Sequence, residues 1–375
     1  MHLKSIQMLR GLAALLVVYT HSITQMGIFA IGWQQRTPAS TSLGTFGVDL
    51  FFVISGFIIY LSAGRLSGRQ PSLSFLWHRF RRINPAYYAA VLITVITWIP
   101  SFLHHSRPSL TGYQLLSWAI LLPFPNQPAR PFPQSWSLYF EWFFYLLFFL
   151  LILIRAQKKA MLLCLLLSGL TLLGWLLRDH LSGVLLSYTD PLLLEFLLGV
   201  GIGVAYQKAT PDKTTALCLL LPGIAFGLVL ILTGYVDYAA ILPPPATVRY
   251  LHAIYWGSAA ALIVAGCVFL EKNGTSTLFF RHRLLLLLGD ASYSLYLFHM
   301  IVFGWIASFY LRVGFFPNPD LAIPIHAAIA VAVSLVFYKV IEVPLLRWLK
   351  RYDLPKSGPP RSEPTPPTPP RSAKP

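Results

Sequence analysis

Two ionisable side chains lie at the ends of an apolar stretch near the start of the chain, RGLAALLVVYTH, which runs from Arg10 to His21. In an α-helix they are three turns plus about 20° apart, so both point to the same side, about 16 Å apart along the axis. A guanidinium binds phosphate, and a neutral imidazole accepts a proton as a general base. The spacing therefore predicts an anion site and a base on one helix face. Simpler explanations remain for each: Arg10 would snorkel to lipid headgroups, and His21 would form an interhelical hydrogen bond.

A glutamate, Glu141, lies inside another apolar stretch, QSWSLYFEWFFY. An ionisable side chain within a membrane span costs roughly 2.5–3.5 kcal/mol even on lenient insertion scales, so each is a functional candidate. A carboxylate that accepts a hydrogen bond from imidazole fixes its tautomer. Because Glu141 and His21 are expected at a similar depth, we predict that they pair. Asp49, in GVDLFFVISGF, is the second choice for this role, since a carboxylate in the first turn of a helix also suits the helix dipole.

A second histidine, His299, lies in the stretch GDASYSLYLFHMIVF. Ser292, Tyr293, Tyr296 and His299 recur at helical spacing, which predicts a polar stripe on the inside of a helix bundle. We predict that His299 and Tyr293, together with Trp136 of SWSLYFEWFFY, bind the substrate. Packing alone is the simpler explanation for the serine and the tyrosines.

The densest cluster of positive charge is FLWHRFRRINPAYY, in which Arg79, Arg81 and Arg82 stand just before Pro85. Guanidinium groups at the start of a helix can bind phosphate groups bidentately. Together with Arg10 they are candidates for binding a polyanionic molecule. Contact with lipid headgroups and the setting of membrane topology would explain the same charges.

Membrane-spanning helices are the elements that would position these residues. Of the 375 residues, 56% are hydrophobic and 11% are charged, against about 25% charged in soluble proteins. The apolar residues form blocks of roughly 20, the length that crosses a bilayer. We predict an all-α polytopic membrane protein of about ten transmembrane helices plus a short re-entrant or interfacial segment at 113–123. The predicted spans are 5–26, 46–63, 84–103, 136–154, 160–178, 189–206, 214–234, 249–270, 285–311 and 320–343.

The charge balance sets the predicted orientation. The net charge is +16, with 29 Lys and Arg against 13 Asp and Glu. Placing both termini in the cytoplasm puts most of the basic residues on the cytoplasmic side, as the positive-inside rule requires, so no nucleic acid partner is expected. The three cysteines lie in apolar blocks, which argues against a disulfide framework. Residues 1–348 form the predicted transmembrane domain, and 349–375 a disordered Pro-rich cytoplasmic tail, with a polyproline ligand as the alternative.

Six stretches, in order along the chain, resemble the motifs of acyltransferase family 3, the membrane-bound O-acyltransferases of bacteria. They are SIQMLRGLAALLVVYTH, GVDLFFVISGFII, HRFRRINPAYY, SWSLYFEWFFY, SYSLYLFH and VIEVPLLR, and the resemblance covers roughly residues 4–348. The first is most similar to the exopolysaccharide acetyltransferase branch. The chain departs from many members at Trp142, where they carry a second acidic residue, so Glu141 stands alone.

The resemblance implies transfer of an acyl group, usually acetyl, from cytoplasmic acyl-CoA to a hydroxyl group of a cell-surface or exported glycan, in the bacterial cytoplasmic (inner) membrane. The four arginines would bind acetyl-CoA, and Arg10, counted among the catalytic residues, would hold a CoA phosphate or line the path of the thioester. The glycan acceptor, lipid-linked or already outside, would approach the other rim among membrane lipids. His21 would act as general base with its tautomer set by Glu141, and no metal would be required.

Two alternatives remain open at this stage. A covalent acyl-histidine or acyl-serine relay is the rival mechanism. A transporter or flippase for a lipid-linked glycan is the rival function, with Arg10, His21 and Glu141 along a substrate or proton path. Many transporters contain inverted repeats with broken helices, and we see no such repeat in this sequence.

Overall fold

The computed structural model describes residues 3–29, 38–103, 111–123, 133–238, 245–275, 282–315 and 317–353, and no strand occurs within these ranges. The helices are α1 (Lys4–Phe29), α2 (Pro38–Ala63), α3 (Arg69–Leu103), α4 (Gly112–Ile120), α5 (Trp136–Leu153), α6 (Lys159–Leu177), α7 (Gly183–Tyr188), α8 (Leu193–Lys208), α9 (Lys213–Thr233), α10 (Ala246–Lys272), α11 (Arg283–Asp290), α12 (Ser292–Val313), α13 (Pro319–Phe337) and α14 (Val343–Leu349).

In the described part of the chain, nine helical segments are long and apolar enough to cross a membrane. Three of them are the least buried: 22% of the α6 span, 28% of the α9 span and 28% of the span that starts with α13 lie inside the molecule. Their exposed side chains include Leu176 and Leu232, which are 66% and 67% accessible. Such surfaces are unfavourable in water but match lipid tails, which are as apolar as leucine. The prediction of an all-α polytopic membrane protein is confirmed.

The predicted span at 84–103 is not among those nine segments. It forms the second half of α3, a single helix of 35 residues that begins at Arg69 and runs through Pro85 without ending. The arginine motif is therefore helical and continuous with the apolar part of α3. The predicted short segment at 113–123 forms α4, of nine residues, which Leu121 ends in the left-handed conformation (φ 51°).

The predicted single span at 285–311 is wrong, because it is two helices. The backbone leaves helical geometry at Ala291 (φ −85°, ψ 2°), between α11 and α12. The break follows the point where α11 packs on α1: a Cβ at Gly289 would lie 2.0 Å from the carbonyl oxygen of Gln7. The side-chain amide of Gln7 also donates to Asp290 (2.7 Å).

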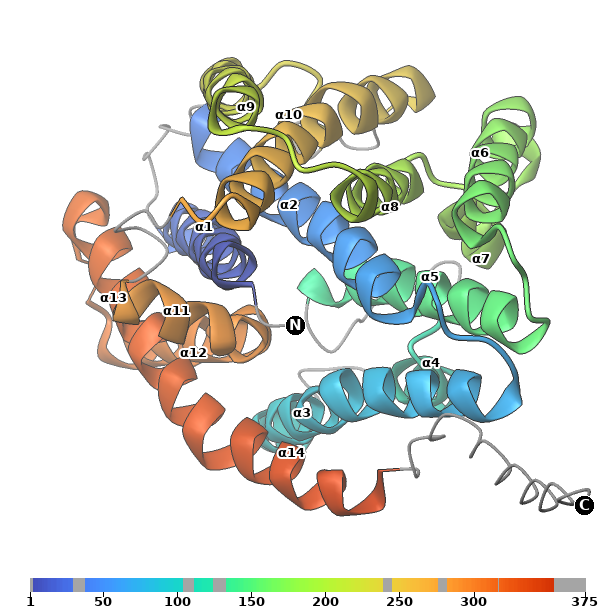
Figure 1. The fold of residues 1–375 in the computed structure, drawn as a ribbon. Coiled ribbons are helices and arrows are strands. Elements are labelled where there is room, and N and C mark those ends of the chain that lie inside the picture. Colours follow the sequence, from blue (N-terminus) through green and yellow to red (C-terminus); the bar gives the residue numbers. More distant parts are fainter. Residues whose placement is uncertain are drawn as a thin grey trace, which may run out of the picture.

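Helix α2 runs through the centre of the bundle and contacts α1, α8 and α10 (Figure 1). Its crossing with α8 is the closest approach: a Cβ at Gly56 would lie 2.0 Å from the carbonyl oxygen of Phe196, and one at Gly199 2.0 Å from that of Val53. Small residues let membrane helices touch through their backbones. This contact holds the two helices at a fixed register.

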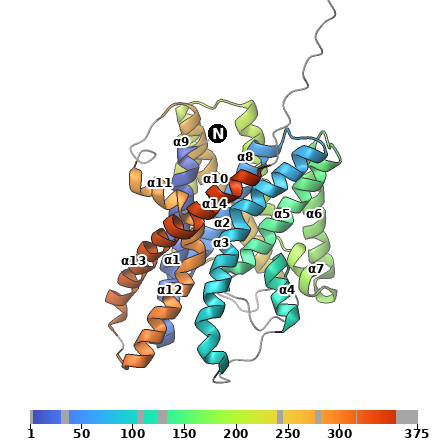
Figure 2. The ribbon, with the colours of Figure 1, turned by 90° about the horizontal axis from the view of Figure 1, so that it is seen from below.

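The C-terminal helices lie at the edge of the bundle away from α9 and α10 (Figure 1). A π-helical turn, Tyr338–Glu342, joins α13 to α14. Helix α14 packs beside α3, and Figure 2 shows the two crossing at one end of the molecule. The start of α3, with its arginines, thus lies next to the end of the described chain.

Candidate active site

A cavity of about 210 Å³ lies among residues of α1, α2, α3, α5 and α12. Pockets for drug-sized ligands are typically roughly 300–1,000 Å³, so this one admits a narrow chain rather than a whole nucleotide. Apolar side chains form much of its wall. The polar residues that line it are Gln7, Arg10, Ser55, Arg79, Arg82, Ser137, Glu141, Tyr145, Ser292, Tyr293 and Tyr296.

Three guanidinium groups, those of Arg10, Arg79 and Arg82, face this cavity. Arg10 donates to the side-chain oxygen of Gln7 (3.3 Å), and Arg79 donates to Ser62 Oγ (3.1 Å). Within the described ranges none of the three forms an ion pair with a carboxylate, since the arginine ion pairs found there belong to other arginines. The cavity therefore presents positive charge that is available to an anion.

Glu141 is the carboxylate of the cavity, and its neighbours are hydroxyl groups. Ser55 Oγ donates to Glu141 Oε1 (3.2 Å), and the hydroxyl of Tyr145 donates to the same oxygen. The predicted pairing of Glu141 with His21 is not formed. Depth alone suggested that pairing, but the rotation of α5 turns Glu141 towards α2 and the arginines.

His21 pairs instead with His299, whose Nε2 lies 3.1 Å from His21 Nδ1. His299 Nδ1 lies 2.7 Å from the carbonyl oxygen of Leu295, and His21 Nδ1 lies 3.0 Å from that of Val17. A carbonyl can only accept, so both Nδ1 atoms carry the proton. His299 Nε2 then accepts from His21 Nδ1–H, and His21 Nε2 keeps its lone pair. This arrangement of atoms suits a base.

Tyr296 connects the cavity to the histidine pair. It lines the cavity, and its ring lies 6.4 Å from that of His299. Its hydroxyl donates to the carbonyl oxygen of Gln134 (2.8 Å) and lies 2.6 Å from Ser137 Oγ. Gln134 in turn donates from its amide to the carbonyl oxygen of Tyr296 (3.2 Å), which fixes the start of α5 against α12.

Asp49 also lies away from His21. It is fully buried and its Oδ1 lies 3.1 Å from Nε2 of His252, on α10. Asp49 is the twelfth residue of α2 rather than part of the first turn, so the helix-dipole explanation does not apply. The helix rotation that puts Val48 into the cavity wall turns Asp49 towards α8 and α10.

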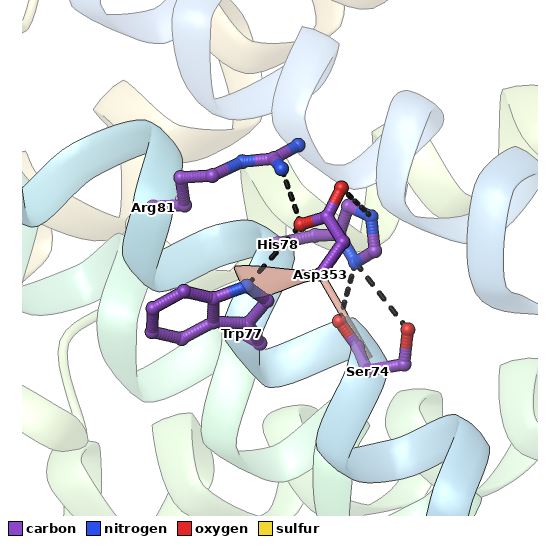
Figure 3. Close-up of polar contacts among 5 residues, drawn as sticks. All are labelled: Ser74, Trp77, His78, Arg81 and Asp353. Carbon is purple, nitrogen blue, oxygen red and sulfur yellow. Dashed lines mark hydrogen bonds and ion pairs between the residues drawn. The ribbon is translucent and has the colours of Figure 1, made fainter. Parts of the chain in front are cut away.

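Arg81 does not line the cavity, unlike its neighbours in the motif. Figure 3 shows its guanidinium paired with Asp353, beyond the end of α14. Trp77 also donates to Asp353 Oδ1 (3.2 Å), and Nε2 of His78 lies 3.8 Å from Oδ2. Partial burial of Asp353 opposes ionisation, but the hydrogen bond and charge of Arg81 outweigh it, with His78 and Trp77 assisting, so its pKa is below the usual value.

The remaining predicted residues lie on two sides of the bundle. Tyr293 lines the cavity and donates from its hydroxyl to the carbonyl oxygen of Ile83 (2.8 Å). Trp136 is not part of the cavity lining: it packs edge-on against Phe52 and Tyr238. It therefore packs behind Phe52, which lines the cavity, and against the segment that precedes α10.

Sequence reasoning missed two partners in these sites. His252 was not singled out, although a lone ionisable residue inside an apolar span is the signal that flagged His21 and Glu141. Ser55 gave no signal, because a serine inside an apolar helix usually bonds its own backbone. Its contact with Glu141 depends on how α2 and α5 pack.

Comparison with known proteins identifies the family of this chain. A family model described as an acyltransferase domain matches residues 3–339. The exopolysaccharide production protein ExoZ of Rhizobium meliloti (strain 1021) is 28% identical over 330 residues, covering 84% of this chain and 93% of that protein. Protein 2 in the picA locus of Rhizobium radiobacter is 34% identical over 93 residues, or 24% of this chain and 43% of that protein.

No solved structure matches the chain. The family assignment therefore stands on the sequence: the match begins before Arg10 and ends in the π-helical turn, so it includes every residue that lines the cavity and both histidines of the pair. The chain belongs to the acyltransferase domain family, acyltransferase family 3.

Proposed function

We propose that this protein transfers an acyl group, usually acetyl, from cytoplasmic acyl-CoA to a hydroxyl group of an exopolysaccharide at the bacterial inner membrane. The observation that carries the proposal is the positively charged cavity that reaches Tyr296, next to the pair of histidines. The family supplies the reaction class. The name of the Rhizobium meliloti relative, an exopolysaccharide production protein, supports the acceptor class.

The charge and width of the cavity support acyl-CoA as the donor. Its lining has three guanidinium groups against the single carboxylate of Glu141, which favours a polyanion such as CoA. The narrow volume suits an extended pantetheine arm, with the phosphates held at the arginines. In this arrangement the thioester would point past Tyr296 towards the histidines.

His21 is the proposed general base. Its Nε2 lone pair would take the proton from the acceptor hydroxyl as that oxygen attacks the thioester carbonyl carbon, a step worth roughly 10²–10⁴-fold in rate. The C–S bond then breaks, and the imidazolium returns the proton to the CoA thiolate. His299 would stabilise the imidazolium by accepting from His21 Nδ1–H.

The test is transfer of labelled acetyl from acetyl-CoA by the purified full-length protein, with exopolysaccharide fragments as acceptor. His21→Ala is expected to lose at least about 100-fold in kcat, while its yield from membranes stays at the wild-type level. His326→Ala is the matched control, since His326 is also buried in a membrane helix but bonds to Tyr310.

Two results would contradict the proposal. If His21→Ala keeps wild-type kcat, His21 is not the base. If the wild-type protein consumes no CoA thioester but moves a lipid-linked glycan across vesicles, the function is transport.

A further inference from the structure

Three ionisable side chains that the proposed reaction does not use meet at the centre of the bundle. They are Asp49 on α2, Glu195 on α8 and His252 on α10, and each is fully buried. One ligand atom from each lies within 4.8 Å of the other two. None of the three lines the cavity, so this is a separate site.

The hydrogen bonds of His252 leave a lone pair facing the carboxylates. Its Nδ1 lies 3.2 Å from the carbonyl oxygen of Val236, which can only accept, so Nδ1 carries the proton. In a neutral imidazole, Nε2 is then an acceptor, and it lies 3.1 Å from Asp49 Oδ1, another acceptor. Two acceptors at that distance repel unless a proton or a metal ion lies between them.

The carboxylates are poorly satisfied by the protein. Among the described residues, no N–H group or hydroxyl donates to Asp49 Oδ2 or to either side-chain oxygen of Glu195, and the two carboxylates lie against each other. Uncompensated buried charge is very unfavourable. The nearby cation, Arg249, is already paired with Asp190 and lies over the ring of Tyr238. If both carboxylates are ionised, the described residues around them supply no cation other than a protonated His252 to balance two negative charges.

We propose that Asp49, Glu195 and His252 bind a divalent transition-metal ion, with zinc as the first choice. One imidazole nitrogen and two carboxylate oxygens form a donor set that zinc commonly uses. A metal-bound histidine typically donates its other N–H to a backbone carbonyl, as His252 does to Val236. The ion would neutralise both carboxylates and remove the clash between acceptors.

The surrounding residues hold this donor set in place. His252 stacks on Trp256 (5.1 Å between ring centroids, 14° between planes), and Trp256 Nε1 donates to the carbonyl oxygen of Tyr235 (2.9 Å). Ligand atoms about 2.0–2.2 Å from zinc lie roughly 3–4 Å apart. Small side-chain movements of Asp49 and Glu195 would therefore close the trio around an ion, which would tie α2, α8 and α10 together.

The experiment measures metal content in full-length protein purified in detergent with a histidine-free affinity tag. After incubation with ZnCl₂ or MnCl₂ and removal of free metal, mass spectrometry of the elements is expected to find about one ion per chain, by the stoichiometry of one trio. Glu195→Gln keeps the shape of the side chain but removes its charge, and is expected to lose the ion. Glu342→Gln is the matched control: Glu342 is also a buried acid, bonded to Ser294 (2.6 Å), and that variant keeps the ion.

A second readout needs no variant and no activity. Chelation is expected to lower the Tm of the wild-type protein, and added zinc to restore it, because an ion that binds only the folded state stabilises it. Wild-type protein without bound metal and without a Tm response would overturn the proposal, and protons would then neutralise the trio. Retention of the ion by Glu195→Gln would also overturn it.

Discussion

Two histidines of the helix bundle, His21 and His252, have opposite surroundings. His21 is half-buried and contacts the imidazole of His299. Tyr296, which lines the positively charged cavity, lies next to this pair. His252 is fully buried, faces Asp49 and Glu195, and lies where helices pack closely. The Nε2 lone pair of His21 is left for a reacting molecule, whereas the Nε2 lone pair of His252 faces Asp49 inside the fold. Changes around His21 should therefore alter catalysis, and changes around His252 should alter stability.

The largest expected effect tests the close packing of α2 against α8, near His252. In Gly199→Ala the new Cβ would lie 2.0 Å from the carbonyl oxygen of Val53, so α2 and α8 must separate. Overpacking typically costs about 1–3 kcal/mol, and a backbone contact cannot relax as a side chain does. We expect a large fall in Tm and in folded yield. Gly201→Ala on the same helix meets no atom within 4 Å and should keep or raise Tm, because alanine favours a helix over glycine. Equal behaviour of the two variants would contradict the close packing.

The next effect tests the charge of the cavity. Arg82→Gln removes a guanidinium from its wall, whereas Arg81→Gln removes the neighbour that pairs with Asp353. A hydrogen bond to a charged group contributes about 1.5–3 kcal/mol, so Arg82→Gln should raise KM for acetyl-CoA about 10- to 100-fold. Arg81→Gln should leave that KM near the wild-type value. Similar KM values for both variants would mean that acyl-CoA does not use the cavity.

A smaller effect tests the link between the cavity and the histidines. Tyr296→Phe removes a hydroxyl that bonds Gln134 and Ser137 beside His299. Loss of a neutral hydrogen bond costs about 1 kcal/mol, so we expect kcat to fall about fivefold with KM for acetyl-CoA unchanged. Tyr310→Phe, which removes a hydroxyl bonded to His326 near the other end of α12, is the control. An unchanged kcat in Tyr296→Phe would contradict a role for the Tyr296 hydroxyl between the cavity and the histidine pair.

The smallest effect lies outside the membrane, at Asp353. Its pKa is lowered in the folded protein, so its ion pair with Arg81 stabilises the fold above the usual carboxyl pKa of about 3.9 and loses that effect as pH falls through the lower, folded value. Asp353→Asn should lower the free energy of unfolding by no more than about 1 kcal/mol at neutral pH. The difference from wild type should vanish in acid. A difference that grows on acidification would contradict this assignment.

The candidate residues could be identified from the sequence, but most of their partners could not. Arg10 and His21 were identified from one apolar stretch, and the structure places Arg10 in the cavity and His21 on the histidine pair. Their partners were not predicted correctly: Glu141 bonds to Ser55 and Tyr145, and Asp49 faces His252. The motif arginines also separated, with Arg79 and Arg82 on one face of α3 and Arg81 on another.

The sequence by itself determined the class of the molecule and nearly all of its spans, because a bilayer requires about 20 apolar residues for each crossing and makes every ionisable exception conspicuous. It also carried the motifs of the family. Only the tertiary structure decided which exceptions meet. The rotation and tilt of a membrane helix are set by packing against its neighbours, such as the glycine contact between α2 and α8, and not by its own apolar length. That rotation sends Val48 to the cavity and Asp49 to His252, one residue apart.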